Sequence, residues 1–329
     1  MRNDTRIKFN HSLKKLAEIN GVETVEKQFT VAPAPEQKLE EKIQASSAFL
    51  QKINITPVTK QSGQAIGLSV NNTIAGRTDT SGSGERKPSD PTGLGADDYT
   101  CKQTDFDVAL PYEKLDAWAG FPDFHARWNS AVAQAIALDR IMIGFNSTSA
   151  AATTDRVANP KLQDVNIGWL EKIRTKAPDR RMNNVTIGAT GTYKNLDSLV
   201  IDAVAELIDD VHQDATDLVV ICGRSLLNDK NFPIVNNAED NQNTLAGQIL
   251  VGQKQIGGLP AVRVPSFPDN TILITSLDNL SIYYQKDSKR RYIVEEPNKN
   301  RVADYQSSNE AYVIEAFEKV ALVEGIAIQ

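Results

Sequence analysis

The sequence predicts an α+β protein, and three stretches carry that prediction. Residues 218–222 form a short apolar run rich in β-branched side chains, which is typical of a strand buried on both faces. Residues 123–146 keep apolar side chains on one helical face for more than twenty positions, too long for a strand. Residues 76–95 are polar and rich in Gly, Pro, Ser and Thr, which indicates a long loop. Together they favour an elongated subunit that mixes helices and sheets.

The N-terminal region is predicted to hold two helices joined by a connector. Asn3 or Asp4 can cap the first helix, whose apolar positions recur every three or four residues until a glycine stop at Gly21. Residues 31–35 read Val-Ala-Pro-Ala-Pro, a stiff extended connector, and Pro35 suits the first turn of a second helix. Two interpretations stay open: a basic appendage on a proline hinge, or an ordinary helix packed on the core.

Two alternating segments flank the polar loop. Residues 64–73 and 99–110 are predicted strands, so the loop between them becomes the tip of an extended hairpin. The tip cannot bury enough apolar area to offset its ordering entropy alone. We therefore expect another molecule to order it.

The chain after the hairpin alternates helices and strands. A kink is expected at residues 120–122 (Gly-Phe-Pro), before the long helix, and a second amphipathic helix over residues 193–212. Gly223 ends the strand at 218–222, and Ser225 can cap a short helix after it. Further strands are predicted over residues 259–264, 271–274 and 312–323, and residues 280–285 and 292–295 are predicted to pair as a hairpin around the basic cluster at 286–291.

Composition excludes several classes of function. The net charge is −6, which argues against a surface built to hold nucleic acid. Cys101 and Cys222 are expected to be two reduced thiols. No apolar run approaches a membrane span, and the first residues lack a signal core, so neither a membrane nor secretion is expected.

Catalytic motifs are missing as well. His11, His125 and His212 have no metal-ligand partner at helical spacing, and there is no cysteine pair to complete a zinc site. The glycine patterns of nucleotide sites and the Gly-x-Ser-x-Gly nucleophile motif are also absent. We expect no cofactor, no metal and no enzymatic activity. An alternative is an α/β enzyme that binds a ligand at the edge formed by residues 217–236.

Several short stretches of the sequence occur in the same order as in one known family. The chain resembles the major capsid proteins of tailed phages, most closely the peduovirus type, over most of its length. The resemblance rests on residues 1–10, 162–169, 217–236, 259–265 and 279–284. It implies the Hong Kong 97-type capsid fold, with an N-terminal arm, an extended β-hairpin loop, a long spine helix in a peripheral domain, and an axial domain.

The resemblance also implies domain boundaries. They are an N-terminal arm at residues 1–60 with a removable segment 1–30, an extended loop hairpin at 61–110, a peripheral domain at 111–212 and 276–329, and an axial domain at 213–275.

By the same resemblance, the chain would self-assemble into the pentamers and hexamers of an icosahedral head that encloses double-stranded DNA. It would be a virion component assembled in the bacterial host cytoplasm, with a scaffolding or protease protein and a portal protein as partners. A head protease would cut near Thr30 or Val31. Another tailed-phage structural protein, a tube or sheath subunit, is the alternative. The candidate inter-subunit contacts are Arg77, Glu85, Arg86 and Lys87 in the loop and Lys289, Arg290 and Arg291 in the basic cluster.

Overall fold

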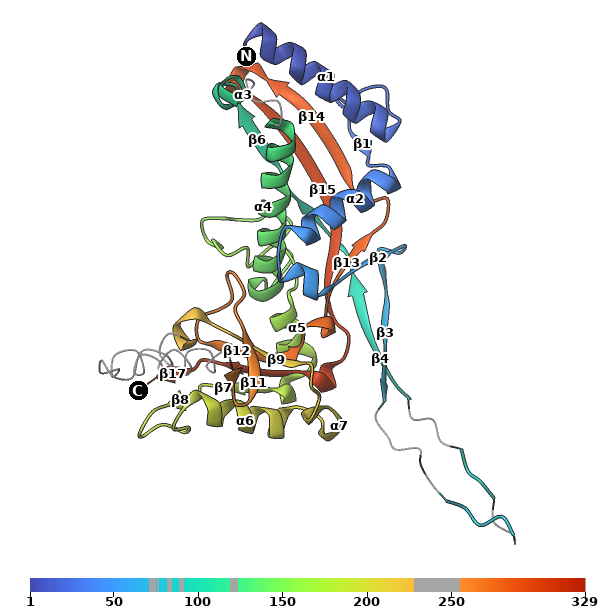
Figure 1. Cartoon of the computed structure of the whole chain (residues 1–329), viewed down its shortest axis with the longest axis vertical. Helices are drawn as coiled ribbons and strands as arrows, with labels where there is room; N and C mark the ends of the chain where they lie inside the picture. Colours follow the sequence, from blue (N-terminus) through green and yellow to red (C-terminus); the bar gives the residue numbers. More distant parts are fainter. Residues whose placement is uncertain are drawn as a thin grey trace, which may run out of the picture.

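The computed structural model describes residues 1–70, 75, 77–81, 85–88, 92–118, 124–227 and 255–328. The molecule is elongated: one sheet with its helices occupies the upper part of Figure 1, a second sheet lies below it, and a hairpin projects away from both. Mixed helices and sheets in this arrangement confirm the α+β class.

The described helices and strands are as follows. The helices are α1 (Asn3–Asn20), α2 (Pro33–Ala45), α3 (Tyr112–Trp118), α4 (Phe124–Asn146), α5 (Trp169–Lys176), α6 (Leu196–Leu207) and α7 (Asp210–Gln213). The first sheet contains β1 (Phe29–Thr30), β2 (Asn54–Val58), β5 (Lys102–Asp105), β6 (Val108–Pro111), β13 (Leu280–Gln285), β14 (Arg290–Glu296) and β15 (Arg301–Ile314). The second contains β7 (Arg181–Asn183), β9 (Leu218–Cys222), β10 (Gln255–Ile256), β11 (Leu259–Val262), β12 (Thr271–Ser276) and β16 (Ala321–Glu324). The hairpin is β3 (Ser62–Val70) with β4 (Thr92–Thr100), and β8 (Thr186–Ile187) pairs with β17 (Ala327–Ile328).

The first sheet is organised around β15, a strand of 14 residues. Its first half pairs with β14 and its second half with β13, both antiparallel. The predicted hairpin between residues 280–285 and 292–295 is therefore wrong. Both segments form strands, but each pairs with a different part of β15 rather than with the other. A strand long enough to serve two partners could not be recognised from local alternation.

The N-terminal helices follow the prediction with shifted boundaries. Gly21 ends α1 in a left-handed conformation with φ 67°, and its N–H reaches Ala17 and Glu18. The expected cap at Asn3 or Asp4 is wrong, because the residue before the helix is Arg2 and no side chain caps it. Helix α2 begins at Pro33 rather than at Pro35.

Helix α1 packs on the first sheet instead of standing free. Phe9 and Ala17 are buried in one cluster with Leu110 of β6 and Ile293 of β14. The packed-helix interpretation of the N-terminus is therefore the correct one for this chain.

The projecting hairpin is shorter than predicted at its C-terminal side. Strands β3 and β4 pair from Ser62 opposite Thr100 to Val70 opposite Thr92. Residues 99–110 do not continue as one strand, because β5 and β6 leave the hairpin and pair with β15.

Helix α4 is the predicted long helix and runs for 23 residues beside the first sheet (Figure 1). Its C-terminal half buries Ile141 and Phe145 against Trp169 of α5. Gly144 permits this contact, since a Cβ there would lie 2.2 Å from the Trp169 ring. The kink expected at residues 120–122 and the side chain of His125 lie outside the described residues.

The second sheet has the order β10-β11-β9-β12-β16-β7 and is covered on one side by α6. The predicted helix over residues 193–212 divides into α6 and α7 near Ile208. Strand β9 lies where it was predicted, but Ser225 sits within the following helical turn, where its hydroxyl donates to the carbonyl of Asp269. The expected start of the axial domain at residue 213 divides the unit formed by the second sheet and α6. Helix α6 and strand β7 precede residue 213, and β16 falls in the range that was expected for the peripheral domain.

Candidate assembly surfaces

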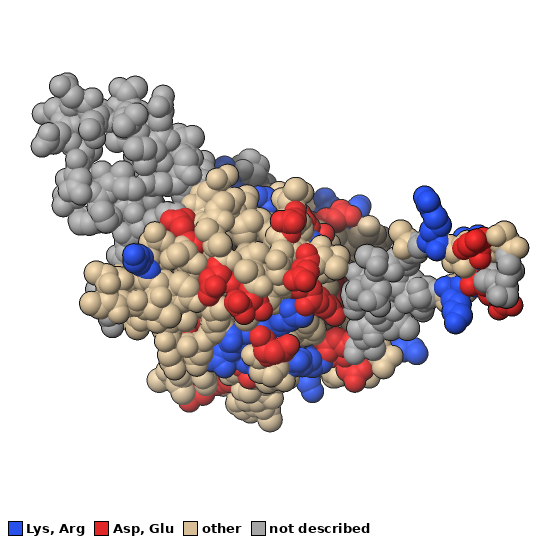
Figure 2. All heavy atoms as spheres, turned by 90° about the horizontal axis from the view of Figure 1, so that it is seen from below, with Lys and Arg blue, Asp and Glu red and all other residues tan. Residues whose placement is uncertain are grey.

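The hairpin carries charged side chains away from the body of the molecule. Arg77, Glu85, Arg86 and Lys87 are all exposed. Figure 2 shows blue and red side chains at the far end of this projection, well separated from the rest of the chain. Charges of both signs in so exposed a place can form complementary pairs with another molecule.

The base of the hairpin, in contrast, is fixed to the body. The rings of Tyr99 and Tyr283 meet edge to face, with centroids 5.2 Å apart. Asp97 of β4 accepts from the Lys172 ammonium of α5 at 3.1 Å and also pairs with Lys176. Burial lowers the pKa of Lys172 to about 8, although the nearby carboxylate of Glu315 acts in the opposite direction. The direction in which the hairpin leaves the body is thus set by packing and by ion pairs.

The structure brings the two halves of the candidate processing junction next to the basic cluster. In the β1–β14 pair, Thr30 lies opposite Arg290, and the Val31 N–H donates to the Lys289 carbonyl at 2.9 Å. Thr30 is exposed, whereas Val31 is only 6% exposed. The junction is therefore an extended strand at the edge of the first sheet.

The three basic residues on β14 and just before it differ in their surroundings. Lys289 is buried and its ammonium pairs with Glu40 of α2. The Arg291 guanidinium binds Asp304 through two hydrogen bonds of 2.9 and 2.7 Å. Arg290 is exposed. Two of the three candidate contacts are thus already paired inside the subunit, and Arg290 remains the one best placed to meet another.

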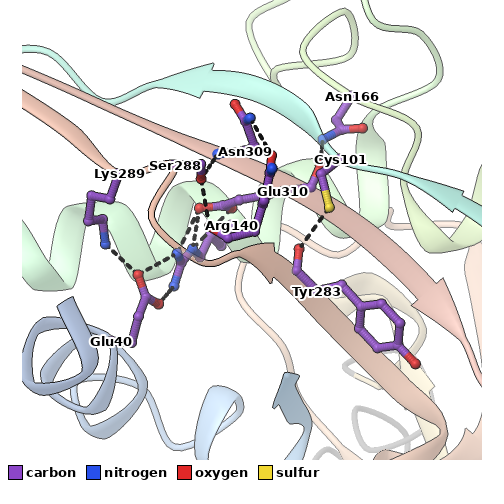
Figure 3. A network of polar contacts seen from close by, with 10 residues as sticks. Glu40, Cys101, Arg140, Asn166, Tyr283, Ser288, Lys289, Asn309 and Glu310 are labelled. Carbon is purple, nitrogen blue, oxygen red and sulfur yellow. Dashed lines mark hydrogen bonds and ion pairs between the residues drawn. The ribbon is translucent and has the colours of Figure 1, made fainter. Parts of the chain in front are cut away.

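A buried charge network, shown in Figure 3, joins the N-terminal arm to both the long helix and the first sheet. The Arg140 guanidinium of α4 contacts the Glu40 carboxylate at 2.7 Å and the Glu310 carboxylate of β15 at 2.7 Å, and Lys289 adds a second cation. Burial alone would raise the pKa of Glu40, but the charges of Arg140 and Lys289 outweigh it and lower that pKa to about 2. In this buried network, the positive charges of Arg140 and Lys289 compensate the negative charges of Glu40 and Glu310.

Sequence reasoning missed this network. Its local signal is a pair of charged residues, Asp139 and Arg140, inside the otherwise apolar stretch from Ile136 to Ile141. The carboxylate partners come from positions 100 and 170 residues away. No rule based on sequence spacing connects residues that are so far apart in the chain.

Within the described residues, no group of three or more His, Cys, Asp or Glu side chains could hold a metal ion. The same part of the chain contains no helix both long and apolar enough to cross a bilayer. Cys101 and Cys222 are buried free thiols.

Comparison with solved structures defines the class of protein. The fold matches a chain in the procapsid of satellite phage P4, a structure that includes the size determination (Sid) protein, with a TM-score of 0.83 and 44% sequence identity over 100% of this chain and 99% of that one. A chain in the capsid of an empty GTA particle shares the fold, with a TM-score of 0.53 at 14% identity over 86% of this chain and 90% of that one. The protein has the Hong Kong 97-type capsid fold.

Sequence comparison then places the chain in one family. Residues 8–326 match the model of the phage major capsid protein, P2 family, and the chain belongs to this family. It is 47% identical over 342 residues to the capsid proteins of Escherichia phage P2, covering 100% of this chain and 96% of the relative. It is 44% identical over 340 residues to the major capsid protein of Serratia phage KSP20, covering 99% and 97%. The chain is thus a phage capsid protein that self-assembles into the head, rather than a tail tube or sheath subunit.

Proposed function

We propose that this chain forms the pentamers and hexamers of an icosahedral head around double-stranded DNA, with the β3–β4 hairpin of each copy lying on a neighbour. The observation that carries this proposal is the hairpin itself: its base is fixed by Asp97 and Tyr99, while its charged tip stands clear of the body. A tip of this composition gains order only against another surface. The obligate interfaces of such a shell total roughly several thousand Å² per subunit.

The domain assignment follows the sheets. The unit around the second sheet is the axial domain, and it takes in α6, β7 and β16 in addition to residues 213–275. The first sheet with α4 is the peripheral domain, and α2 belongs to it through Glu40.

Residues 1–30 form a removable segment, cut by a head protease near Thr30 or Val31. The junction separates two differently attached parts. Helix α2 on one side is tied to the core by the buried Glu40 network, whereas α1 on the other rests on the sheet surface with an exposed Arg6–Glu295 ion pair. A cut at residue 30 would leave the buried network intact.

Assembly takes place in the bacterial host cytoplasm, with a scaffolding or protease protein and a portal protein as partners. Contact with packaged DNA is non-specific, which suits the net charge of −6, since strong binding would need a cationic wall.

Deleting residues 79–92 tests the assembly role. Far-ultraviolet circular dichroism of the deletion should match wild type, because the removed stretch lies beyond the anchored base. Negative-stain images and sedimentation velocity should show shells for wild type and only small species for the deletion. In a second variant, a Gly/Ser linker of equal length replaces the same residues, so the loop keeps its length but loses its charges. Comparing the two variants shows whether assembly depends on the charges of the tip or on its length. Normal shells from both variants would refute the proposed contact.

A further inference from the structure

An open apolar groove lies over the outer part of the first sheet. It has a volume of about 500 Å³ and is lined by residues of α1 and of the N-terminal half of α4. Leu13, Leu16 and Ile19 line one wall, Trp128 lines the other, and Ile293 of β14 lies on the floor.

The groove continues toward α2. A second hollow of about 240 Å³ shares Leu16 and Ile19 with the first and extends to Leu39 and Val132. Ile19 is 53% exposed, although it lines both hollows. The helices above this face of the sheet therefore leave an apolar strip uncovered, and its shape suits one further amphipathic helix lying between α1 and α4.

The rim of the groove is basic. Lys15 of α1 and Lys38 and Lys42 of α2 line it and are exposed. Arg291 also lines both hollows, but Asp304 neutralises it. The exposed acidic side chains of α1 and α2 nearest to these lysines in sequence, Glu18 and Glu41, line neither hollow.

We propose that this groove binds an acidic amphipathic helix of a partner protein. Apolar side chains of that helix would fill the strip at Leu13, Leu16 and Ile19, and its carboxylates would meet the rim lysines. A second copy of this chain fits less well. The described part of the hairpin tip is not helical, and its two carboxylates, Asp79 and Glu85, are outnumbered by Arg77, Arg86 and Lys87, which the rim would repel. The acidic helix α6 already buries its apolar face on its own sheet.

The inference rests on the proposed function in one respect only. Removal of residues 1–30 would take away the wall formed by α1 and with it Lys15. The partner helix is thus held by the uncut chain and released when the segment is removed.

The test is a selection from a displayed library of helical peptides against the intact chain. Binders are expected to place apolar residues at positions i, i+3 or i+4, and i+7, with Asp and Glu elsewhere. Fluorescence anisotropy with the strongest peptide should show at least a tenfold loss of affinity for Ile19→Glu and for Lys38→Glu with Lys42→Glu. The same peptide carrying Lys in place of Glu should recover binding to the charge-reversed variant.

Matched controls lie outside the groove. Ile7→Glu changes an equally apolar residue of α1 that is 69% exposed, and Lys52→Glu with Lys60→Glu reverses two exposed charges elsewhere. Both should bind the peptide as wild type does. Basic or non-helical binders, or an equal loss in the controls, would overturn the inference, as would groove substitutions that weaken self-association but not peptide binding. Because these measurements use the uncut chain, an intact N-terminus in mature particles would refute the processing step alone.

Discussion

Arg140 of α4 and Glu310 of β15 form an ion pair with no exposed surface on either side chain, and their nearest atoms are 2.7 Å apart. Removing one member of a buried pair leaves the other charge without compensation. Arg140→Ala should therefore lower the free energy of unfolding by about 3–5 kcal/mol. Denaturant unfolding of the unassembled chain measures this. Lys299→Ala removes a lysine that is 55% exposed and lies 3.8 Å from Glu296, so this control should have a much smaller effect. Equal losses in the two variants would contradict the role given to the network.

The same network predicts sensitivity to acid. The pKa of Glu40 in the folded chain is lowered to about 2 from an ordinary 4.5. A lowered carboxyl pKa contributes stability that is fully present above pH 4.5 and is lost as the pH falls through the folded value. Unfolding free energies measured between pH 5 and pH 2 should decrease more steeply for wild type than for Glu40→Gln. Parallel curves would show that Glu40 does not carry this dependence.

Gly144 should not tolerate a methyl group. In a helix, alanine is normally favoured over glycine by about 1 kcal/mol. Here an added Cβ would lie 2.2 Å from Trp169, whose ring is held by Phe145 and Tyr312 at centroid distances of 5.0 and 5.3 Å. Overpacking of this kind costs about 1–3 kcal/mol or more, so Gly144→Ala should lower the melting temperature. Gln134→Ala, at an exposed position of α4, should not. A more stable Gly144→Ala would show that the contact relaxes easily.

The proposed processing junction should be cut only after it leaves the sheet. Thr30 lies directly opposite Arg290, so Thr30→Cys with Arg290→Cys can form a cross-strand disulfide. The oxidised chain should resist the head protease, and a reductant should restore cleavage, because proteolysis requires local opening of a paired segment. Mass spectrometry of the products measures both states. Equal cleavage rates with and without reductant would refute this requirement for opening, whereas an absence of cleavage in wild type would refute the processing step itself.

The sequence predicted the elements whose evidence is local. The uniform apolar face of α4, the buried run of β9 and the Gly21 stop of α1 each depend on neighbours within a few residues. It failed where distant segments decide the structure. Strand β15 pairs with β14 along its first half and with β13 along its second, so β13 and β14 do not form the expected hairpin. Strands β5 and β6 also pair with β15 instead of continuing β4.

The candidate inter-subunit contacts also could be predicted only where the evidence is local. The exposed charges of the loop could be chosen from composition alone. Lys289 and Arg291 are paired inside the subunit because Glu40 and Asp304 lie beside them. Thr30 and Arg290 are neighbours because β1 pairs with β14, although the two residues are 260 positions apart in the sequence.

In the assembled shell, the hairpin tip of one copy should lie on another copy. Shells assembled from an equal mixture of unlabelled and ¹⁵N-labelled chains, treated with a lysine-reactive cross-linker and digested, test it directly through Lys87. Cross-linked peptides that contain Lys87 are expected to join labelled to unlabelled chains about as often as random mixing allows. Cross-links from Lys87 found only within single chains would contradict it.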